Sequence, residues 1–263
     1  MTQYARLAPS AAHRWINCTG SLAIEEQCPP QPESEFAAEG TAAHELAEHC
    51  LNNNDVAHAY IGVEFNKFIV DEDMAAHVQT YLDNIHEYAE HNHLYVEKRV
   101  NFSCAIGVAG SFGTADAIIL TNDHKELQIH DLKFGRGVQV FAESNEQLMT
   151  YGLGAYDLFS TVAEIERLRF VIHQPRLGWL DDWDVGVGAL LDFRDEAYDA
   201  AQDATHMADN FGHQTAIYGV DDLELTPGEK QCRWCRAKTD CPAIAQHVLN
   251  TVADDFVDLT EVA

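Results

Sequence analysis

Three apolar stretches in the middle of the chain constrain its fold most strongly. They span residues 94–102, 110–121 and 127–134, are rich in Val, Ile, Phe and Leu, and are separated by Gly, Asn and Asp. Apolar runs bounded by turn residues are typical of β-strands. The segment Asn122-Asp123-His124-Lys125 is the expected turn between the last two runs. The sequence therefore predicts three consecutive strands, arranged as a meander.

Helical patterns lie on both sides of these strands. The expected helices cover residues 36–52, 72–91, 144–160 and 193–211, and two further strands are expected at 167–174 and 183–191. This order of elements predicts an α/β fold of the α+β kind, with a mixed central β-sheet flanked by helices. The chain has 263 residues, of which 46% are hydrophobic, which is enough for one large domain with a proper core.

The charge of the chain is strongly acidic. A formal charge of −27 argues against a general nucleic-acid binder, because such proteins usually carry a basic face. A metal-dependent nuclease can still work when bound cations and local basic residues line its cleft; the candidates are Lys98, Arg99, Lys133, Arg136, Arg167 and Arg169. No apolar run approaches the length of a membrane span, and the first residues lack the layout of a signal peptide. We therefore expect a cytoplasmic protein without membrane contacts.

Two carboxylates and one lysine are expected near the ends of two of the strands. Asp116 ends the segment Gly113-Thr114-Ala115-Asp116, and Asp131 begins the segment Asp131-Leu132-Lys133. Lys133 lies on the same face as Asp131, because side chains alternate along a strand with period two. Two carboxylates can hold a hard divalent cation, and a lysine can orient a nucleophile or steady a phosphate. The set suits metal-assisted attack on a phosphodiester; solvated acids and a structural ion pair are the alternatives.

Two expected helices carry further candidates. His44 follows Gly40, Ala42 and Ala43, small residues that let its helix approach the sheet, so its imidazole could complete a carboxylate-rich metal site. Gln147 and Tyr151 lie one helical turn apart and share a face. Their functional interpretation is a pair that touches DNA phosphate or orients the lysine. The alternative is a core tyrosine beside a surface glutamine.

The chain has seven cysteines, an odd number that excludes full disulfide pairing. Cys232, Cys235 and Cys241 lie within ten residues, and thiolates this close repel one another unless they are metallated or protonated. Zinc and a cubane iron–sulfur cluster each require about four protein ligands. Cys18 is the best candidate for the fourth, followed by Cys28 and, for zinc, His247. The isolated Cys28, Cys50 and Cys104 are expected to be small buried residues.

The order of these motifs resembles the PD-(D/E)XK nuclease superfamily, and within it the RecB-like branch. The cysteine pattern is similar to that of the iron–sulfur nucleases of this branch, which include the CRISPR-associated exonuclease family and the nuclease domain of the AddB helicase subunit. The opening Ser10…Trp15…Cys18…Ser21 further resembles an uncharacterised, phage-encoded family of such nucleases. The resemblance covers roughly residues 8–245. The proline of the superfamily's name is absent here, and Ala115 precedes the acid.

The resemblance implies a role for each matching residue. His44, Asp116 and Asp131 would ligate Mg²⁺ or Mn²⁺ together with the Leu132 carbonyl. Lys133 would be the catalytic lysine, supported by Gln147 and Tyr151. A 4Fe–4S cluster, with zinc as the alternative, would be held by Cys18, Cys232, Cys235 and Cys241. The expected domain is a restriction-endonuclease-like unit over residues 1–263, with a helical segment about 36–92, a catalytic core about 94–174 and the cysteine cluster 232–241 joined to Cys18.

The function expected from this resemblance is a metal-dependent DNA exonuclease in phage recombination or DNA processing, in the host cytoplasm if the protein is phage-encoded. DNA would be the substrate, a single-strand annealing protein would be a partner by analogy, and a homo-oligomer is compatible with this activity. Two other functions compete with it. One is a catalytically silent acidic scaffold or inhibitor that binds a basic protein, which the charge favours. The other is a zinc-ribbon adaptor, which explains only the cysteines.

Overall fold

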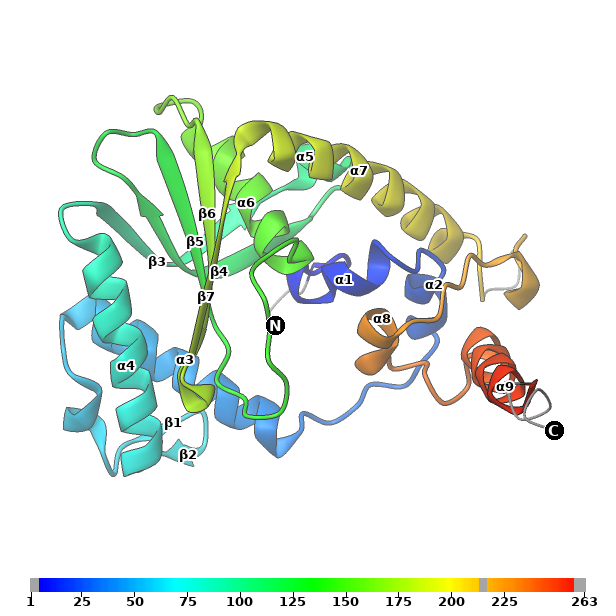
Figure 1. The fold of residues 1–263 in the computed structure, drawn as a ribbon, viewed down its shortest axis with the longest axis horizontal. Helices are drawn as coiled ribbons and strands as arrows, with labels where there is room; N and C mark the ends of the chain where they lie inside the picture. The colour runs from blue at the N-terminus through cyan, green and yellow to red at the C-terminus, as the bar shows by residue number, and fades with distance from the viewer. Residues whose placement is uncertain (1–4, 213–216, 258–263) are drawn as a thin grey trace. The chain divides into compact units, whose positions relative to one another are not determined.

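A five-stranded mixed β-sheet forms the centre of the computed structural model, which describes residues 5–212 and 217–257 (Figure 1). The strands follow one another in space in sequence order: β3 (His93–Asn101), β4 (Phe112–Leu120), β5 (Glu126–Leu132), β6 (Arg167–Gln174) and β7 (Trp179–Gly186). Only β5 and β6 pair in parallel; the other neighbours in this sheet are antiparallel. The predicted meander and mixed sheet are therefore confirmed.

The chain divides into two compact units. The first comprises Met1–Pro9, Gln31–Ala105 and Ala109–Arg194, and it contains the whole sheet. The second comprises Ser10–Pro30, Ile106–Val108 and Asp195–Ala263.

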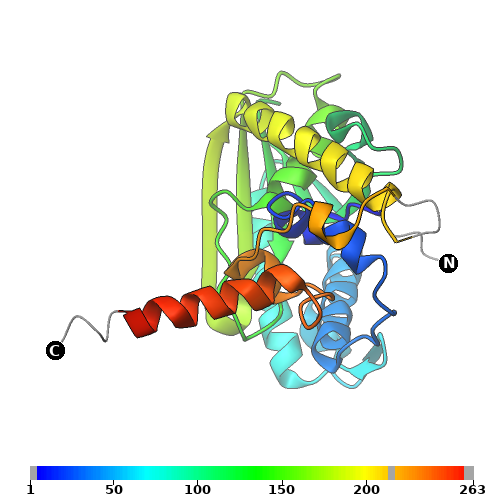
Figure 2. The ribbon, with the colours of Figure 1, turned by 90° about the vertical axis from the view of Figure 1, so that its right-hand side faces the viewer.

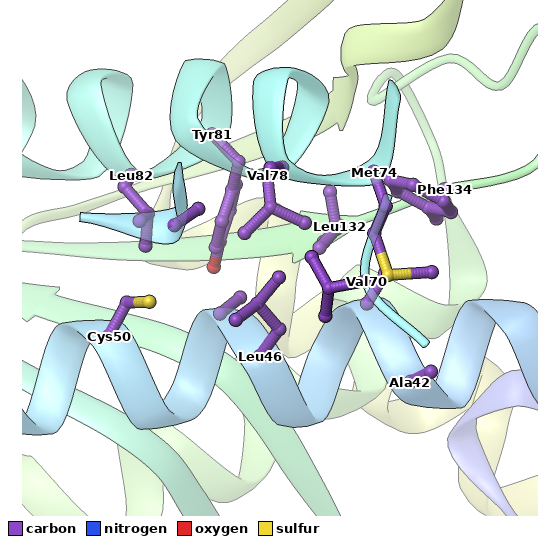
Figure 3. Close-up of a cluster of buried hydrophobic side chains, with 14 of the residues drawn as sticks. Ala42, Leu46, Cys50, Val70, Met74, Val78, Tyr81, Leu82, Leu132 and Phe134 are labelled. Atoms are coloured by element: carbon purple, nitrogen blue, oxygen red, sulfur yellow. The ribbon is translucent and has the colours of Figure 1, made fainter. Parts of the chain in front are cut away.

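Helices cover both faces of the sheet in the first unit. Helix α3 (Glu35–Asn53) and helix α4 (Glu72–Ala89) share an apolar core with Ala117 and Leu132 of the sheet (Figure 3). Both helices begin at a side-chain cap: Ser34 accepts a hydrogen bond from Ala37, and Asp71 accepts one from Met74. These caps satisfy backbone N–H groups that the first helical turn leaves without partners.

Helix α6 (Glu146–Phe159) connects β5 to β6 and packs on the opposite face. Two of its glycines make this approach close. A Cβ atom on Gly152 would lie 2.9 Å from the ring of Phe170, and one on Gly154 would lie 2.9 Å from Val100 Cβ. Only a residue without a side chain fits at these two positions, so α6 is held against the strands.

Helices and the loops between them make up the described part of the second unit. It contains α1 (Ala12–Trp15), α2 (Ser21–Glu25), most of α7 (Val187–Asp209), α8 (Glu229–Arg233) and α9 (Pro242–Val257) (Figure 2). Helices α1 and α8 contact each other although they come from opposite ends of the chain. The strand expected over residues 183–191 is wrong in its second half, because β7 ends at Gly186 and α7 begins at Val187. Short apolar runs do not distinguish a strand from a buried helical turn.

Candidate metal centre and cysteine site

Asp131, Lys133 and Gln147 form a closed ring of polar contacts in the first unit. Lys133 Nζ lies 2.9 Å from Asp131 Oδ2 and donates to Gln147 Oε1 at 2.8 Å. Gln147 Nε2 in turn donates to Asp131 Oδ1 at 2.8 Å. The end of β5 supplies the acid, the residue directly after β5 supplies the lysine, and the first turn of α6 supplies the amide. The structure thus brings these three predicted site residues together.

A second group of polar side chains lies beside this ring. His44, Glu97 and Asp116 each offer one ligand atom, and these atoms lie within 4.8 Å of one another; it is the one such group in the described parts of the chain. His44 Nδ1 lies 3.2 Å from Asp116 Oδ1, and the Leu132 amide donates to Asp116 Oδ2 at 2.6 Å. One imidazole and two carboxylates are a donor set that suits Mn²⁺ or Mg²⁺. The predicted pair of His44 and Asp116 is therefore in place, and Leu132 lines the same pocket.

Glu97 is the member of this group that was not predicted from the sequence. It lies within β3, where Val96 pairs with Ala117 and Lys98 pairs with Ala115, so Glu97 is opposite Asp116. Its φ of 44° is in the left-handed region, which is costly for a residue other than glycine. Like charges directly opposite one another in a sheet are also unfavourable. Backbone strain and charge repulsion thus both occur at Glu97. This combination is expected at a site that binds a ligand.

The left-handed residue coincides with a break in the alternation of β3. Tyr95 stacks on Phe159 of α6, and Val100 contacts Gly154 of the same helix. A regular strand would place these two residues on opposite faces, because an odd number of positions separates them. Glu97 lies between them and lines a pocket with His44 and Tyr81 from the other helical layer. The irregular backbone thus redirects this carboxylate.

The electrostatics of the group favour a bound cation. Burial and the nearby charge of Asp116 raise the pKa of Glu97 to about 7. Burial alone would lower the pKa of His44, but the charge and hydrogen bond of Asp116 outweigh it and raise this pKa to about 9. Burial likewise opposes ionisation of Asp116, yet His44 and the Leu132 amide hold its pKa below the usual value. A divalent cation would relieve the repulsion between the acids, so the residues present fit such an ion.

Asp131 and Tyr151 lie near the group of three but do not line its pocket. Ala117 pairs with His130 in the β4–β5 ladder, so the next position sets Asp131 opposite Asp116. Burial raises the pKa of Asp131, and the nearby Asp116 adds to the effect although Lys133 opposes it. Tyr151 is buried, and burial followed by the charges of Asp131 and Asp116 raises its pKa. A row of three acids, Glu97, Asp116 and Asp131, therefore crosses three adjacent strands.

The four predicted cysteine ligands line one pocket of the second unit. Its wall includes Cys18, Cys232, Cys235 and Cys241, together with Arg14 and Lys238. Cys28 instead donates to the Ile24 carbonyl at 3.5 Å, and the exposed helix α9 carries His247. The structure thus groups Cys18 with the C-terminal three.

Cys50 is buried as expected, whereas the expectation that Cys104 is buried is wrong, because that residue is exposed at the surface.

Backbone amides point at the sulfur atoms of this pocket. The Thr226 amide donates to Cys18 Sγ at 3.3 Å, and the Gly228 amide donates to Cys232 Sγ at 3.4 Å. Burial nevertheless raises the pKa of Cys18, and burial with the charge of Glu25 raises that of Cys235 to about 11. Without a cation these thiols keep their protons, and a bound metal would favour the thiolates. The donor set and its amides fit a thiolate-ligated metal centre.

Most of the basic residues expected near a cleft have acidic partners. Arg136 pairs with Asp73 at 2.6 Å, and Arg169 pairs with Asp184 at 2.6 Å. Arg167 pairs with Glu126. Lys98 and Arg99, directly after Glu97, contact aromatic rings instead and make no ion pair in the described structure. Among the candidates near a cleft, these two side chains are therefore the ones without an acidic partner in the described structure.

The fold and the site define a mixed α/β protein with a carboxylate-rich centre and a separate cysteine pocket. The chain belongs to the family DUF2800, described as proteins of unknown function, whose model matches residues 4–263. Among solved structures, the crystal structure of SSO0001 is similar over 86% of this chain and 95% of that chain, with 14% identity and a TM-score of 0.32. Among the described helices, none is both long and apolar enough to cross a membrane.

Proposed function

We propose that this protein is a Mg²⁺- or Mn²⁺-dependent deoxyribonuclease of the PD-(D/E)XK type, acting as an exonuclease. The observation that carries the proposal is the ring of Asp131, Lys133 and Gln147 directly beside the group of His44, Glu97 and Asp116. Acids, a lysine and an imidazole converge at one place from α3, β3, β4, β5 and α6. Few chemistries other than metal-assisted hydrolysis use such a set.

Each residue has a distinct task in this proposal. His44, Glu97, Asp116 and Asp131 would hold the cation, which when bound polarises the phosphate and lowers the pKa of water. Lys133 places its positive charge where the attacked phosphate gains negative charge. Gln147 fixes the lysine and the carboxylate of Asp131 relative to each other, so neither has to reorient during the reaction. Tyr151 would support Gln147, with which it shares a hydrogen bond, from its buried position on α6.

DNA is the proposed substrate despite the acidic composition. Lys98 and Arg99 follow the proposed ligand Glu97 in β3 and make no ion pair in the described structure, so this part of the strand retains positive charge that a DNA backbone could meet. The rest of the attraction would come from the bound cation itself, which is the largest local charge in such a site. Phage recombination with a single-strand annealing protein as partner remains the biological setting that the motif pattern favours.

A nuclease assay with matched variants tests this proposal. Linear and circular DNA are incubated with the protein and Mg²⁺ or Mn²⁺, before and after chelation. Lys133→Ala should lose about a hundredfold or more in rate, corresponding to about 3 kcal/mol. Lys125→Ala is the control, because Lys125 lies at an exposed turn and pairs with Glu166. Equal cleavage by both variants would contradict the proposal, and degradation of linear DNA alone would support an exonuclease.

The charge of −27 favours a second function, an acidic scaffold or inhibitor that binds a basic protein. This function predicts no cleavage by the wild-type protein under any metal condition. It also predicts that binding to the partner weakens steeply with salt, because it would rest on surface charge.

We further infer that Cys18, Cys232, Cys235 and Cys241 hold a 4Fe–4S cluster. Four thiols in one pocket and two amides that donate to sulfur support this inference, since such hydrogen bonds accompany clusters of this kind. The cluster would have a structural task, because it joins the first and last segments of the second unit. Zinc is the alternative occupant, and metal analysis distinguishes the two.

A further inference from the structure

Two polar groups that line the metal pocket lack hydrogen-bond partners in the described structure. The Tyr81 hydroxyl is fully buried and makes no hydrogen bond. The Glu97 carboxylate receives none from the described residues either. Tyr81 and Glu97 line the same pocket with Asp116. A buried hydroxyl without a partner destabilises the folded protein, so its presence requires an explanation.

The Tyr81 hydroxyl is aimed away from its own helix. Figure 3 shows the side chain reaching from α4 toward α3, the helix that also carries His44. The ring packs edge-to-face on His173 with centroids 5.0 Å apart, and His173 is held by His130 at 2.9 Å. The ring is therefore fixed by packing, and the hydroxyl cannot easily reach another partner.

Toward the carboxylates that line this pocket, the hydroxyl can only donate a hydrogen bond. Burial raises the pKa of Tyr81 well above its usual value, and the charges of Asp116 and Glu97 raise it further. A tyrosine hydroxyl already keeps its proton near neutral pH, so it is available as a donor here. A neutral donor beside a row of carboxylates complements them without competing for the cation.

We propose that Tyr81 is a positioning residue, whose hydroxyl donates a hydrogen bond to Glu97 when a divalent cation occupies the centre. This inference rests on the proposed metal site. The bond would fix the Glu97 oxygen that does not face the cation. Metal-ligating carboxylates commonly have such outer partners, and removal of one lowers metal affinity about tenfold to hundredfold. It would also balance the strain that the left-handed backbone of Glu97 imposes.

Manganese titration of purified variants tests this proposal without reference to cleavage. Tyr81→Phe keeps the ring and removes only the hydroxyl. It should weaken Mn²⁺ binding about tenfold or more, measured by electron paramagnetic resonance of the free ion. The same change should leave the melting temperature of the metal-free protein equal or higher, because an unsatisfied buried group is lost. Tyr88→Phe, two turns along the same helix, is the matched control and should change neither quantity.

A double-mutant cycle identifies the partner. In a Glu97→Gln background, Tyr81→Phe should have little further effect on Mn²⁺ affinity, because the two residues act as one unit. Unchanged Mn²⁺ affinity in the Tyr81→Phe single variant would overturn the inference without contradicting the proposed metal site. An equal loss in both backgrounds would also overturn it, since Tyr81 would then act through another residue. Absence of Mn²⁺ binding by the wild-type protein would instead overturn the metal site itself.

Discussion

Glu97 lies opposite Asp116 across the β3–β4 ladder, and the two carboxylates share one pocket with His44. Without a bound cation this arrangement is unfavourable, because burial and repulsion by Asp116 raise the pKa of Glu97 to about 7. A residue that costs stability and lies among ligand atoms is expected to serve binding.

Replacement of Glu97 by glutamine should therefore separate stability from metal binding. Glu97→Gln removes the repulsion with Asp116, so the metal-free protein should melt at a higher temperature at pH 8, where the acid is ionised. The same variant should bind Mn²⁺ about tenfold more weakly or worse, because it loses a charged ligand. Calorimetry and Mn²⁺ titration measure the two effects. Glu87→Gln, at an exposed position of α4, should show neither. A lower melting temperature with unchanged affinity would assign Glu97 a structural role.

Gln147 is expected to control turnover more than substrate binding. Gln147→Leu keeps the size of the side chain but breaks its bonds to Lys133 and Asp131. Both groups would then have to reorient in each cycle, so kcat should fall about tenfold or more while KM changes little. Steady-state kinetics on linear DNA give both constants. Gln139→Leu, on the exposed loop before α6, is the control. An increase in KM alone would place Gln147 in DNA binding.

The cysteine pocket predicts a selective loss of metal. Anaerobically purified protein should be brown and contain iron and sulfide. Cys18→Ser should lose iron and stability as severely as Cys235→Ser, because both line the same pocket. Cys28→Ser should keep its iron, since Cys28 bonds to the Ile24 carbonyl instead. Elemental analysis with one zinc per chain and no iron would retain the cysteine ligands but reject the cluster. Full iron content in Cys18→Ser would show that the fourth ligand is another residue.

Two buried histidines predict sensitivity to acid. Burial lowers the pKa of His173 to about 4, and burial with the neighbouring His173 lowers that of His130 well below its usual value. Between about pH 6.5 and pH 4 the unfolded chain therefore binds protons that the folded chain does not. The free energy of unfolding should fall with decreasing pH there, by about 1.4 kcal/mol per pH unit for each histidine.

Urea denaturation of the metal-free protein at several pH values measures this slope. His173→Gln should flatten it, because the amide can still donate to His130 but does not titrate in this range. The matched variant His86→Gln, at an exposed position of α4, should leave the slope as in the wild type. Equal slopes in all three proteins would mean that other groups cause the acid sensitivity.

The periodicity of the sequence predicted the sheet and its main helices, because both repeat over many residues. The expected strand at 167–174 matches β6, and the expected helix at 72–91 matches α4 to within two residues at its end. The predicted end of the last strand was wrong, because β7 ends at Gly186 and helix α7 starts directly after it without a turn. Apolar side chains on both sides of that junction give no local signal of the change.

The candidate site was predictable where motifs have fixed spacing, and less so where it depends on register. His44, Asp116, Asp131, Lys133 and Gln147 come together in the structure as the motif pattern implied. Glu97 escaped detection, because its importance comes from the cross-strand position opposite Asp116 and from a backbone angle that the sequence does not state. The sequence signal that could have identified Glu97 is its position as a single acid between Val96 and Lys98 in an apolar strand.

The position of Cys18 in the second unit has a consequence for the order of synthesis. Thr226 donates to its sulfur from 208 residues further along the chain, and the other three cysteines follow later still. A ribosome therefore releases the whole β-sheet before it has made the residues that enclose Cys18. During this interval the thiol lacks the three cysteines that share its pocket, so a metal held by all four could bind only after translation has passed Cys241. Premature termination before Cys241 would leave a finished β-sheet attached to an incomplete cysteine pocket.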